Sequence, residues 1–223
     1  MLSFSEHRLF RSTPDGSWVR TGTDPDGNCF FNAYAYSVQP NAYRSMDAHK
    51  RKQYVMRIKQ FFSSKLSHQD TLDLIDVSFF EVFLKAMTSV LEPTYKLPDL
   101  SKQPLQSISS YVELLYKTHP VLRTNEPFRR IIDEISEQYH ARMREYVQRD
   151  GSWMFDTLIP LFMNKMEINI IMISHETGMP ITHYAPLESC ETIFMYHIHD
   201  HFESVGLYKN SLMKRVFEHA SFP

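Results

Sequence analysis

The chain has 223 residues, with 24 Lys and Arg against 26 Asp and Glu, a formal net charge of −2 and 43% hydrophobic residues. This length suits one large domain or a domain with a subdomain, and the apolar content, which includes 16 Phe and 12 Tyr, excludes a disordered chain. Near-neutral charge gives no sign of a general nucleic-acid or membrane-surface partner.

The first half of the chain predicts a short strand followed by helices. A turn at 13–16 precedes a strand over 17–21, and a Gly-containing turn at 26–28 leads into a helix with apolar residues at helical spacing. The same periodicity predicts amphipathic helices over Ala42–Leu66 and Leu72–Met87.

The middle of the chain predicts a helical insertion. Three prolines make residues 92–106 a loop and a subdomain edge, and helices follow over Ser107–Lys117 and Asn125–Arg149. The apolar stripe of the second helix is expected to face a core. We therefore predict one domain over 1–223 with a helical subdomain at about 70–148.

The last third changes to strands. A helix over Trp153–Met166, kinked at Pro160, precedes a buried strand over 168–173. Further strands are expected over 181–184, 193–198 and 202–208. Helices followed by clustered strands predict an α+β domain with a small central sheet flanked by helices.

The segment Asp26-Gly27-Asn28-Cys29 has the form of a nucleophile turn. Cysteine attacks as the thiolate, which is favoured at a helix N-terminus and beside an imidazolium. The predicted helix sets Cys29 at its first turn, where free N–H groups and the helix dipole stabilise negative charge. Because a lone buried cysteine is more often a small hydrophobic residue, the interpretation needs a base elsewhere in the chain.

His201 is the candidate base, at the start of the segment His201-Phe202-Glu203-Ser204-Val205. Catalytic Cys and His are typically distant in sequence and adjacent in the fold. An acid lies near each of them, Asp26 near the cysteine and Glu203 near the histidine, and either carboxylate could orient the imidazole. Cys190 has neither a basic neighbour nor a Gly turn, so we interpret it as structural.

Both segments resemble signatures of the ovarian-tumour (OTU) family of cysteine proteases, most of which are deubiquitinases. The family's Asp-Gly-x-Cys turn is matched by residues 26–29, and its His-Tyr-Asp/Asn-x-Val strand by residues 201–205, with Phe for Tyr and Glu for Asp or Asn. Residues 153–173 resemble the family's preceding helix and strand, with Trp153-Met154 in place of Trp-Gly. The resemblance covers about the first 40 residues and roughly 150–208.

The resemblance implies a papain-like fold, with the cysteine on a helix and the histidine on a strand. It implies ubiquitin, polyubiquitin or a ubiquitin-like modifier as the partner, and no cofactor. Departures of this kind are frequent in OTU-like proteins of intracellular bacteria and large DNA viruses, so a host-pathogen effector acting in the host-cell cytoplasm is expected. A cytoplasmic location also follows from the 2 cysteines, which are too few for a disulfide scaffold, and neither a secretory signal nor a membrane helix is recognisable.

In the mechanism that this predicts, His201 takes the Cys29 proton and the thiolate attacks an amide carbonyl. The backbone N–H groups of Asp26, Gly27, Asn28 and Cys29 are expected to form the oxyanion hole. Glu203 is favoured to orient His201, because residues i and i+2 share a strand face. Asp26 is the next candidate, with a role in fixing the loop as its more natural use, and Asp24 is the third.

Two alternatives remain open. The first is a catalytically inactive OTU-like ubiquitin-binding module, in which the substitution of Glu for the usual Asp or Asn prevents turnover. The second is a metal-binding domain, because strand alternation over 197–201 would put His197, His199 and His201 on one face. No fourth ligand stands at a recognisable spacing, so the second is the less favoured.

Overall fold

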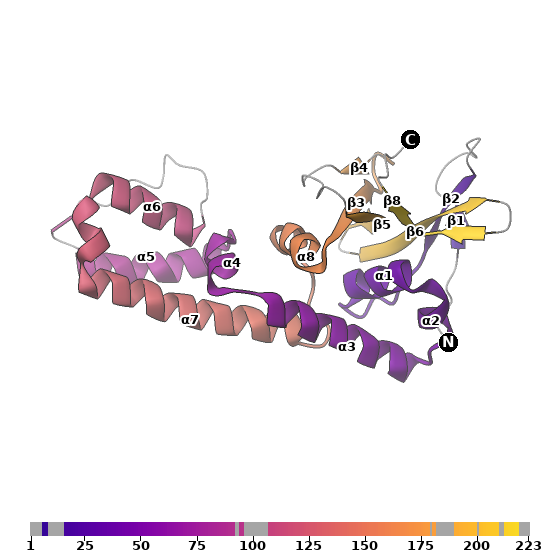
Figure 1. Cartoon of the computed structure of the whole chain (residues 1–223), viewed down its shortest axis with the longest axis horizontal. Coiled ribbons are helices and arrows are strands. Elements are labelled where there is room, and N and C mark those ends of the chain that lie inside the picture. Colours follow the sequence, from indigo (N-terminus) through magenta and orange to yellow (C-terminus); the bar gives the residue numbers. More distant parts are fainter. Residues whose placement is uncertain are drawn as a thin grey trace. The chain divides into compact units, whose positions relative to one another are not determined.

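In the computed structural model the chain divides into two units, which we call unit 1 (Met1–Phe62 and Val147–Pro223) and unit 2 (Ser63–Tyr146) (Figure 1). The structure describes residues 6–8, 16–91, 94–95, 107–178, 180–181, 190–199, 201–209 and 212–218. Both regions that carry the sequence signatures lie in unit 1. Unit 2 holds most of the stretch predicted as a helical insertion at about 70–148.

Unit 1 is built on a mixed sheet. Its strand order is β1-β2-β6-β5-β3-β4, where β3 and β5 are parallel and the other neighbours antiparallel. Two further strands pair with this path, β7 with β6 and β8 with β5. The strands are β1 (Glu6–Arg8), β2 (Ser17–Thr21), β3 (Ile168–Ser174), β4 (Pro180–Ile181), β5 (Glu191–Ile198), β6 (His201–Lys209), β7 (Leu212–Lys214) and β8 (Val216–Glu218).

This sheet with its flanking helices confirms the α+β fold class. The strands predicted over 17–21, 168–173, 193–198 and 202–208 are confirmed within a residue or two of their ends. The strand predicted over 181–184 corresponds to β4 at its first residue, and residues 182–184 lie outside the described part of the chain.

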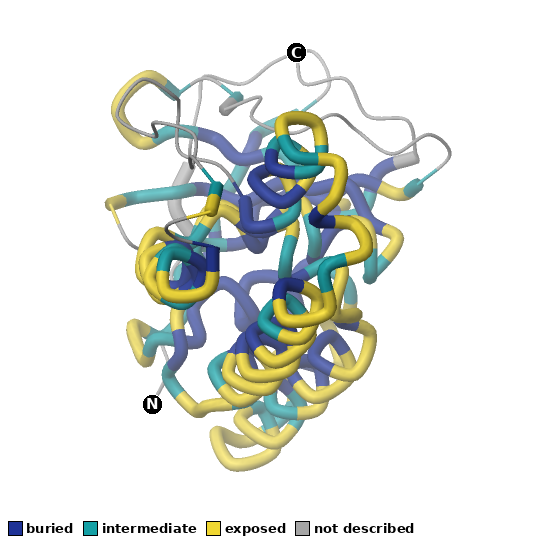
Figure 2. The backbone as a smooth tube through the Cα atoms, turned by 90° about the vertical axis from the view of Figure 1, so that its left-hand side faces the viewer, coloured by how far each residue is buried: buried dark blue, intermediate teal, exposed yellow. Residues whose placement is uncertain are grey.

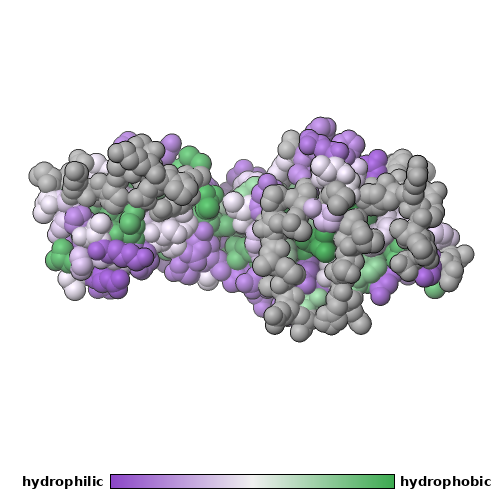
Figure 3. Space-filling view, turned by 90° about the horizontal axis from the view of Figure 1, so that it is seen from above, coloured by the Kyte–Doolittle hydropathy of each residue, from purple (hydrophilic) through white to green (hydrophobic). Residues whose placement is uncertain are grey.

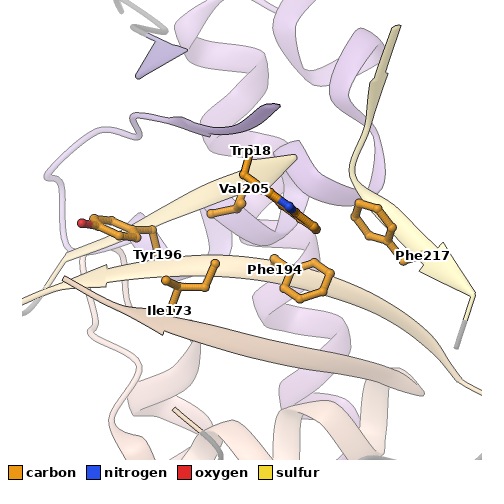
Figure 4. Close-up of a cluster of buried hydrophobic side chains, with 6 residues drawn as sticks. All are labelled: Trp18, Ile173, Phe194, Tyr196, Val205 and Phe217. Atoms are coloured by element: carbon orange, nitrogen blue, oxygen red, sulfur yellow. The ribbon is translucent and has the colours of Figure 1, made fainter. Parts of the chain in front are cut away.

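One face of the sheet carries a compact hydrophobic cluster, shown in Figure 4. Its centre is Trp18 of β2, whose ring lies 5.0 Å from that of Phe194 and 5.5 Å from that of Phe217. The cluster is made of Trp18, Ile173, Phe194, Tyr196, Val205 and Phe217. Side chains alternate between the two faces along a strand. Because Val205 lies on this face, Phe202 and Ser204 of the same strand lie on the opposite face.

Helices α1 (Cys29–Val38) and α8 (Ile159–Met166) pack against the sheet, and α3 (Ala48–Lys65) meets α8 through an aromatic contact. Phe162 of α8 is fully buried among their aromatic rings, with centroid distances of 5.2 Å to Phe30, 5.0 Å to Tyr34 and 5.0 Å to Phe62. Phe30 also meets Phe202 of β6 edge to face at 5.3 Å. Aromatic packing therefore joins α1 to β6, the strand that begins with His201. In Figure 1, α1 lies beneath this strand.

The helix predicted over Ala42–Leu66 is wrong in its continuity, because α2 (Pro40–Ser45) and α3 are separate helices. Met46 between them is extended, with φ −73° and ψ 143°, and the Asp47 carboxylate then accepts the backbone N–H of Lys50 at 2.8 Å. A side chain that accepts an otherwise unpaired N–H starts a new helix. A polar capping residue does not change the spacing of apolar residues, so the apolar pattern alone does not reveal the break between the two helices.

The same reason divides the helix predicted over Leu72–Met87. Here α4 (His68–Asp73) ends before an extended Leu74, and α5 (Val77–Leu91) begins after Asp76, whose carboxylate accepts the N–H of Ser78 at 3.0 Å.

The helix predicted over Trp153–Met166 is also wrong in its start. A short 3-10 turn, η3 (Asp156–Leu158), leads into α8, which begins at Ile159. Pro160 lies in the first turn of α8, where a missing backbone N–H costs nothing, so it initiates the helix and does not kink it.

Unit 2 consists of helices with an aromatic core of their own. The predicted helices over Ser107–Lys117 and Asn125–Arg149 are confirmed as α6 (Ile108–Thr118) and α7 (Glu126–Gln148), with the 3-10 turn η2 (Pro120–Thr124) between them. Phe79 stacks on Tyr139 at 3.8 Å, and Phe80 meets Tyr111 edge to face at 5.5 Å. The loop predicted over 92–106 lies outside the described residues, apart from 94–95.

The apolar stripe predicted for α7 faces this core. Phe128, Ile135, Tyr139 and Met143 are all buried, and buried and exposed positions alternate along the helices in Figure 2. Hydrophilic and hydrophobic residues are interspersed on the molecular face seen in Figure 3. Within the described ranges, none of the helices combines the length and apolar character needed to cross a membrane.

We expect Phe162→Ala to lower the free energy of unfolding of unit 1 by about 3–5 kcal/mol, because it empties the centre of an aromatic core. Phe61→Ala is the matched control, since Phe61 is 50% exposed and its removal should cost about 0.5 kcal/mol. Urea unfolding followed by the fluorescence of Trp18, which is buried in unit 1, measures both. Equal losses for the two variants would contradict the assignment of this core.

Candidate active site

Cys29 is the first residue of α1. The turn before it is held by hydrogen bonds to the side chain of Asp26, a residue of the turn itself. The Asp26 Oδ1 atom accepts the backbone N–H of Asn28 at 2.9 Å and the Asn32 side-chain amide at 3.1 Å. Asp26 therefore fixes the loop that presents the cysteine. Because the Asn28 N–H is donated to Asp26, it is not directed toward a substrate oxyanion, which leaves Asp26, Gly27 and Cys29 of the predicted oxyanion-hole donors.

Gly27 brings this turn into direct backbone contact with a distant segment. It has φ +77°, and a Cβ atom placed on it would lie 2.2 Å from the carbonyl oxygen of Gly151. Gly151, between α7 and α8, also has a positive φ of +72°. Glycine is required at position 27 for both its backbone conformation and its close packing.

The Asn28 side chain strengthens this contact with polar bonds. Its Nδ2 donates to Asp150 Oδ1 at 3.0 Å, and its Oδ1 accepts from the Gly151 N–H at 3.1 Å and from Lys59 Nζ at 2.5 Å. The Cys29 turn is thus attached to residues 149–152 by a buried polar network. Neither Lys59 nor Asp150 belongs to a recognisable sequence motif, so the sequence analysis missed them.

The packing of α1 on β6 brings Cys29 beside the residue that follows His201. The backbone N–H of Phe202 donates a hydrogen bond to the Cys29 sulfur. Further along the two elements, Ser37 Oγ and Ser204 Oγ lie 2.7 Å apart in a buried hydrogen bond. Two segments from opposite ends of the sequence therefore meet where the sequence analysis expected a nucleophile and its base.

Burial opposes ionisation of the Cys29 thiol. Cys29 is 6% exposed, and its pKa is raised above the ordinary range, first by loss of hydration and then by the Asp26 charge. The backbone N–H groups of Phe202 and Phe30 act in the opposite direction. The neutral thiol is therefore favoured at neutral pH in the absence of substrate.

His201 makes its side-chain contact with Thr23, a residue that the sequence analysis did not single out. Thr23 Oγ1 lies 3.4 Å from His201 Nε2 and donates a hydrogen bond to the Phe202 carbonyl oxygen at 2.6 Å. Asp24 lies within electrostatic reach of the same ring. Burial and the Asp26 charge raise the Asp24 pKa, while Arg51 and His201 lower it.

Glu203, the favoured orienting acid, has a different partner. Its Oε2 atom lies 3.4 Å from the Arg20 guanidinium in an ion pair, and that guanidinium sits 4.9 Å from the centre of the Tyr196 ring. No hydrogen bond joins Glu203 to His201 among the residues that the structure describes. Strand alternation does put both on one face of β6, as predicted, but Arg20 holds the carboxylate.

The alternation expected for His197, His199 and His201 is wrong, because these residues span a hairpin. His197 belongs to β5 and stacks on Phe202 at 4.6 Å, whereas His201 begins β6. His199 between the strands has φ +50°. The described residues contain no group of His, Cys, Asp and Glu side chains that could hold a metal ion.

Two other features lie apart from this site. Cys190 precedes β5, and its carbonyl oxygen accepts the Asn169 side-chain amide at 3.3 Å. A cavity of about 440 Å³ lies at the opposite end of α1, where Tyr34 and Val38 face residues of α3 and of the turn between α8 and β3. Neither Cys29 nor His201 lines it.

Solved structures to which this chain is similar include OTU domains. An OTU domain in complex with ubiquitin matches 99% of this chain and 86% of its own, with a TM-score of 0.45 and 12% identity. Viral OTU domain proteases from Dera Ghazi Khan virus and Farallon virus each match 93% of this chain, and 97% and 99% of their own, with TM-scores of 0.40 and 0.39 and identities of 11% and 12%. No protein-family model and no curated protein matches the sequence.

The contact between Gly27 and Gly151 predicts unequal effects of two similar substitutions. Both Gly27→Ala and Gly151→Ala place a side chain at positive φ, which costs about 1–2 kcal/mol. The backbone clash is severe only in Gly27→Ala, since the Cβ at 151 would lie 3.2 Å from its nearest neighbour, the Asp26 carbonyl oxygen, against 2.2 Å for the Cβ at 27. Urea unfolding should show Gly27→Ala to be the more destabilising of the two, and the reverse order would disprove the packing of the turn.

Proposed function

We propose that this protein is a cysteine-type deubiquitinase of the OTU kind, which hydrolyses peptide or isopeptide bonds at the C-terminus of ubiquitin or a ubiquitin-like protein. The observation that carries this proposal is the position of Cys29 at the N-terminus of α1, with its sulfur bound by the N–H of the residue after His201. The resemblance of both segments to the OTU signatures supplies the substrate class.

In the proposed reaction His201 accepts the Cys29 proton, and the thiolate attacks the carbonyl carbon of the scissile bond. The C–N bond breaks, the amine leaves with the proton from the imidazolium, and a thioester remains on Cys29. Water then hydrolyses the thioester, with His201 as the base, and restores the thiol. The N–H groups of Asp26, Gly27 and Cys29 are the proposed donors to the oxyanion, each of which contributes about 3 kcal/mol.

The burial of Cys29 fits a thin substrate. Because the Cys29 side chain is only 6% exposed, an extended chain without bulky side groups reaches it more readily than an ordinary peptide does. The Gly-Gly end of ubiquitin has this form.

Thr23 and Glu203 are the two proposed orienting residues for His201. Thr23 is proposed because its Oγ1 contacts His201 Nε2, and Asp24 is a charged residue within electrostatic reach of the same ring. Glu203 is proposed because it lies on the same face of β6 as His201. Its carboxylate would have to leave Arg20 to reach the imidazole.

A second candidate function is an inactive ubiquitin-binding module with the same fold. Two observations favour it: burial raises the Cys29 pKa, and Arg20 holds the residue at the position where the family usually has Asp or Asn. Binding of ubiquitin without turnover would then be the activity of this protein.

Ubiquitin with a C-terminal electrophile distinguishes the two functions. We expect it to label the wild type and the Cys190→Ala variant, and to leave Cys29→Ala unlabelled, because only Cys29 lies beside the histidine strand. Incubation of wild type and Cys29→Ala with all eight ubiquitin dimers then shows which linkages are cleaved. Binding of ubiquitin by the wild type with neither labelling nor cleavage would establish the inactive module.

Paired substitutions separate the two orienting residues. If Thr23 orients His201, Thr23→Val should lower kcat/KM for a fluorogenic ubiquitin substrate about threefold to tenfold, the value of one hydrogen bond. Glu203→Gln should then change it less than twofold. The opposite ranking would assign the role to Glu203 and show that its ion pair with Arg20 opens during catalysis.

A further inference from the structure

Lys59 of α3 is a fully buried lysine whose hydrogen-bonding capacity is filled. Its Nζ donates to Asn28 Oδ1 at 2.5 Å, to the Arg149 carbonyl oxygen at 2.8 Å and to Ser152 Oγ at 3.0 Å, with the Ser152 carbonyl oxygen at 3.4 Å. An ammonium group has three N–H donors, so these acceptors satisfy all of them. All of these acceptors are electrically neutral.

A buried charge on neutral partners is costly to the fold. The cost is visible in the pKa of Lys59, which burial lowers to about 8. A neutral side chain of similar length would fill the same volume without this cost. The cation therefore calls for a reason beyond packing.

Asn28 connects this cation to the cysteine turn. It immediately precedes Cys29, and its Oδ1 accepts both Lys59 Nζ and the Gly151 N–H. The Lys59 ammonium also lies 5.0 Å from the centre of the Phe31 ring, in the first turn of α1. It is thus held at the helix end that carries the sulfur, and its attraction to a Cys29 thiolate acts to raise the Lys59 pKa.

Other charged groups face this site, and they bear on any pH measurement. Asp26 lies in the turn, Asp24 precedes it, and His201 begins β6. Asp150 lies in the 149–152 segment and is ion-paired at 2.5 Å with Lys52 of α3, a lysine whose side chain is 59% exposed. Lys52 is therefore part of the same network, whereas Lys50 of the same helix pairs with Asp47 and has a side chain that is 70% exposed, so Lys50 is the matched control cation.

We propose that Lys59 is a positioning residue for Cys29: acting through Asn28, its ammonium group holds the cysteine turn on residues 149–152 and keeps a positive charge where it stabilises the Cys29 thiolate. This role rests on Cys29 being the nucleophile of the proposed function, and it is independent of the identity of the substrate. Lys59 stands shortly before Phe62, where the chain leaves unit 1, and Arg149 shortly after Val147, where it returns. The interaction therefore also joins the two ends of the insertion to the cysteine turn.

The test is the pH dependence of Cys29 alkylation by iodoacetamide in a Cys190→Ala background. The rate at neutral pH divided by the plateau rate at high pH reports the fraction of thiolate at neutral pH, and a change in access alone alters both rates and leaves this ratio unchanged. We expect Lys59→Met to lower the ratio about threefold to tenfold, because an ammonium group with a pKa of about 8 is charged at neutral pH and uncharged at the plateau. Lys50→Met should change the ratio by less than about 1.5-fold, because an exposed charge is screened by solvent.

A second variant keeps the test decisive if Lys59→Met does not fold. Asn28→Ser retains the cation and removes its link to the turn, so it should also lower the ratio. A ratio equal to that of the wild type in the folded variants, or an equal fall in Lys50→Met, would overturn the proposal.

Alkylation needs no ubiquitin, so failure of this proposal is distinguishable from failure of the proposed function. A lowered ratio in Lys59→Met supports the role of Lys59 even if the ubiquitin electrophile labels nothing. Labelling by the electrophile together with an unchanged ratio retains the deubiquitinase and removes the role of Lys59.

Discussion

The packing of α1 on β6 is the contact on which the proposed site depends. Phe30 against Phe202 and the buried Ser37–Ser204 hydrogen bond fix the helix along the strand. Because Cys29 begins the helix and His201 begins the strand, this packing brings the N-terminus of one element beside the N-terminus of the other. The chemistry proposed for the chain follows from that alignment.

The same packing creates a conflict between burial and reactivity. An aromatic core excludes water from the Cys29 sulfur and raises the pKa of the thiol, which opposes the thiolate that a nucleophile requires. The surroundings supply compensating groups: the N-terminus of α1 and the Phe202 N–H favour negative charge at this place, and the role proposed for the Lys59 ammonium adds to them.

Unit 2 is inserted into unit 1 without separating the parts of the proposed site. The chain leaves after Phe62 and returns at Val147, and the contacts between Gly27 and Gly151 and between Lys59 and Arg149 lie on the unit 1 side of those points. Unit 2 buries its own aromatic cluster around Phe79, Tyr111 and Tyr139. Each unit thus has a core that its own residues complete.

The sequence by itself determined the local features of this protein. Apolar periodicity located most helices and strands and put Cys29 at a helix start, and Gly27 marked a turn that only glycine can form. Helix caps such as Asp47 and Asp76 escaped it, because a single polar side chain leaves the apolar period unchanged. The tertiary structure alone decided that Thr23 contacts His201, that Arg20 holds Glu203, and that Lys59 is bound to Asn28. Such polar contacts join residues far apart in the chain, and only the folded backbone brings their atoms within bonding distance.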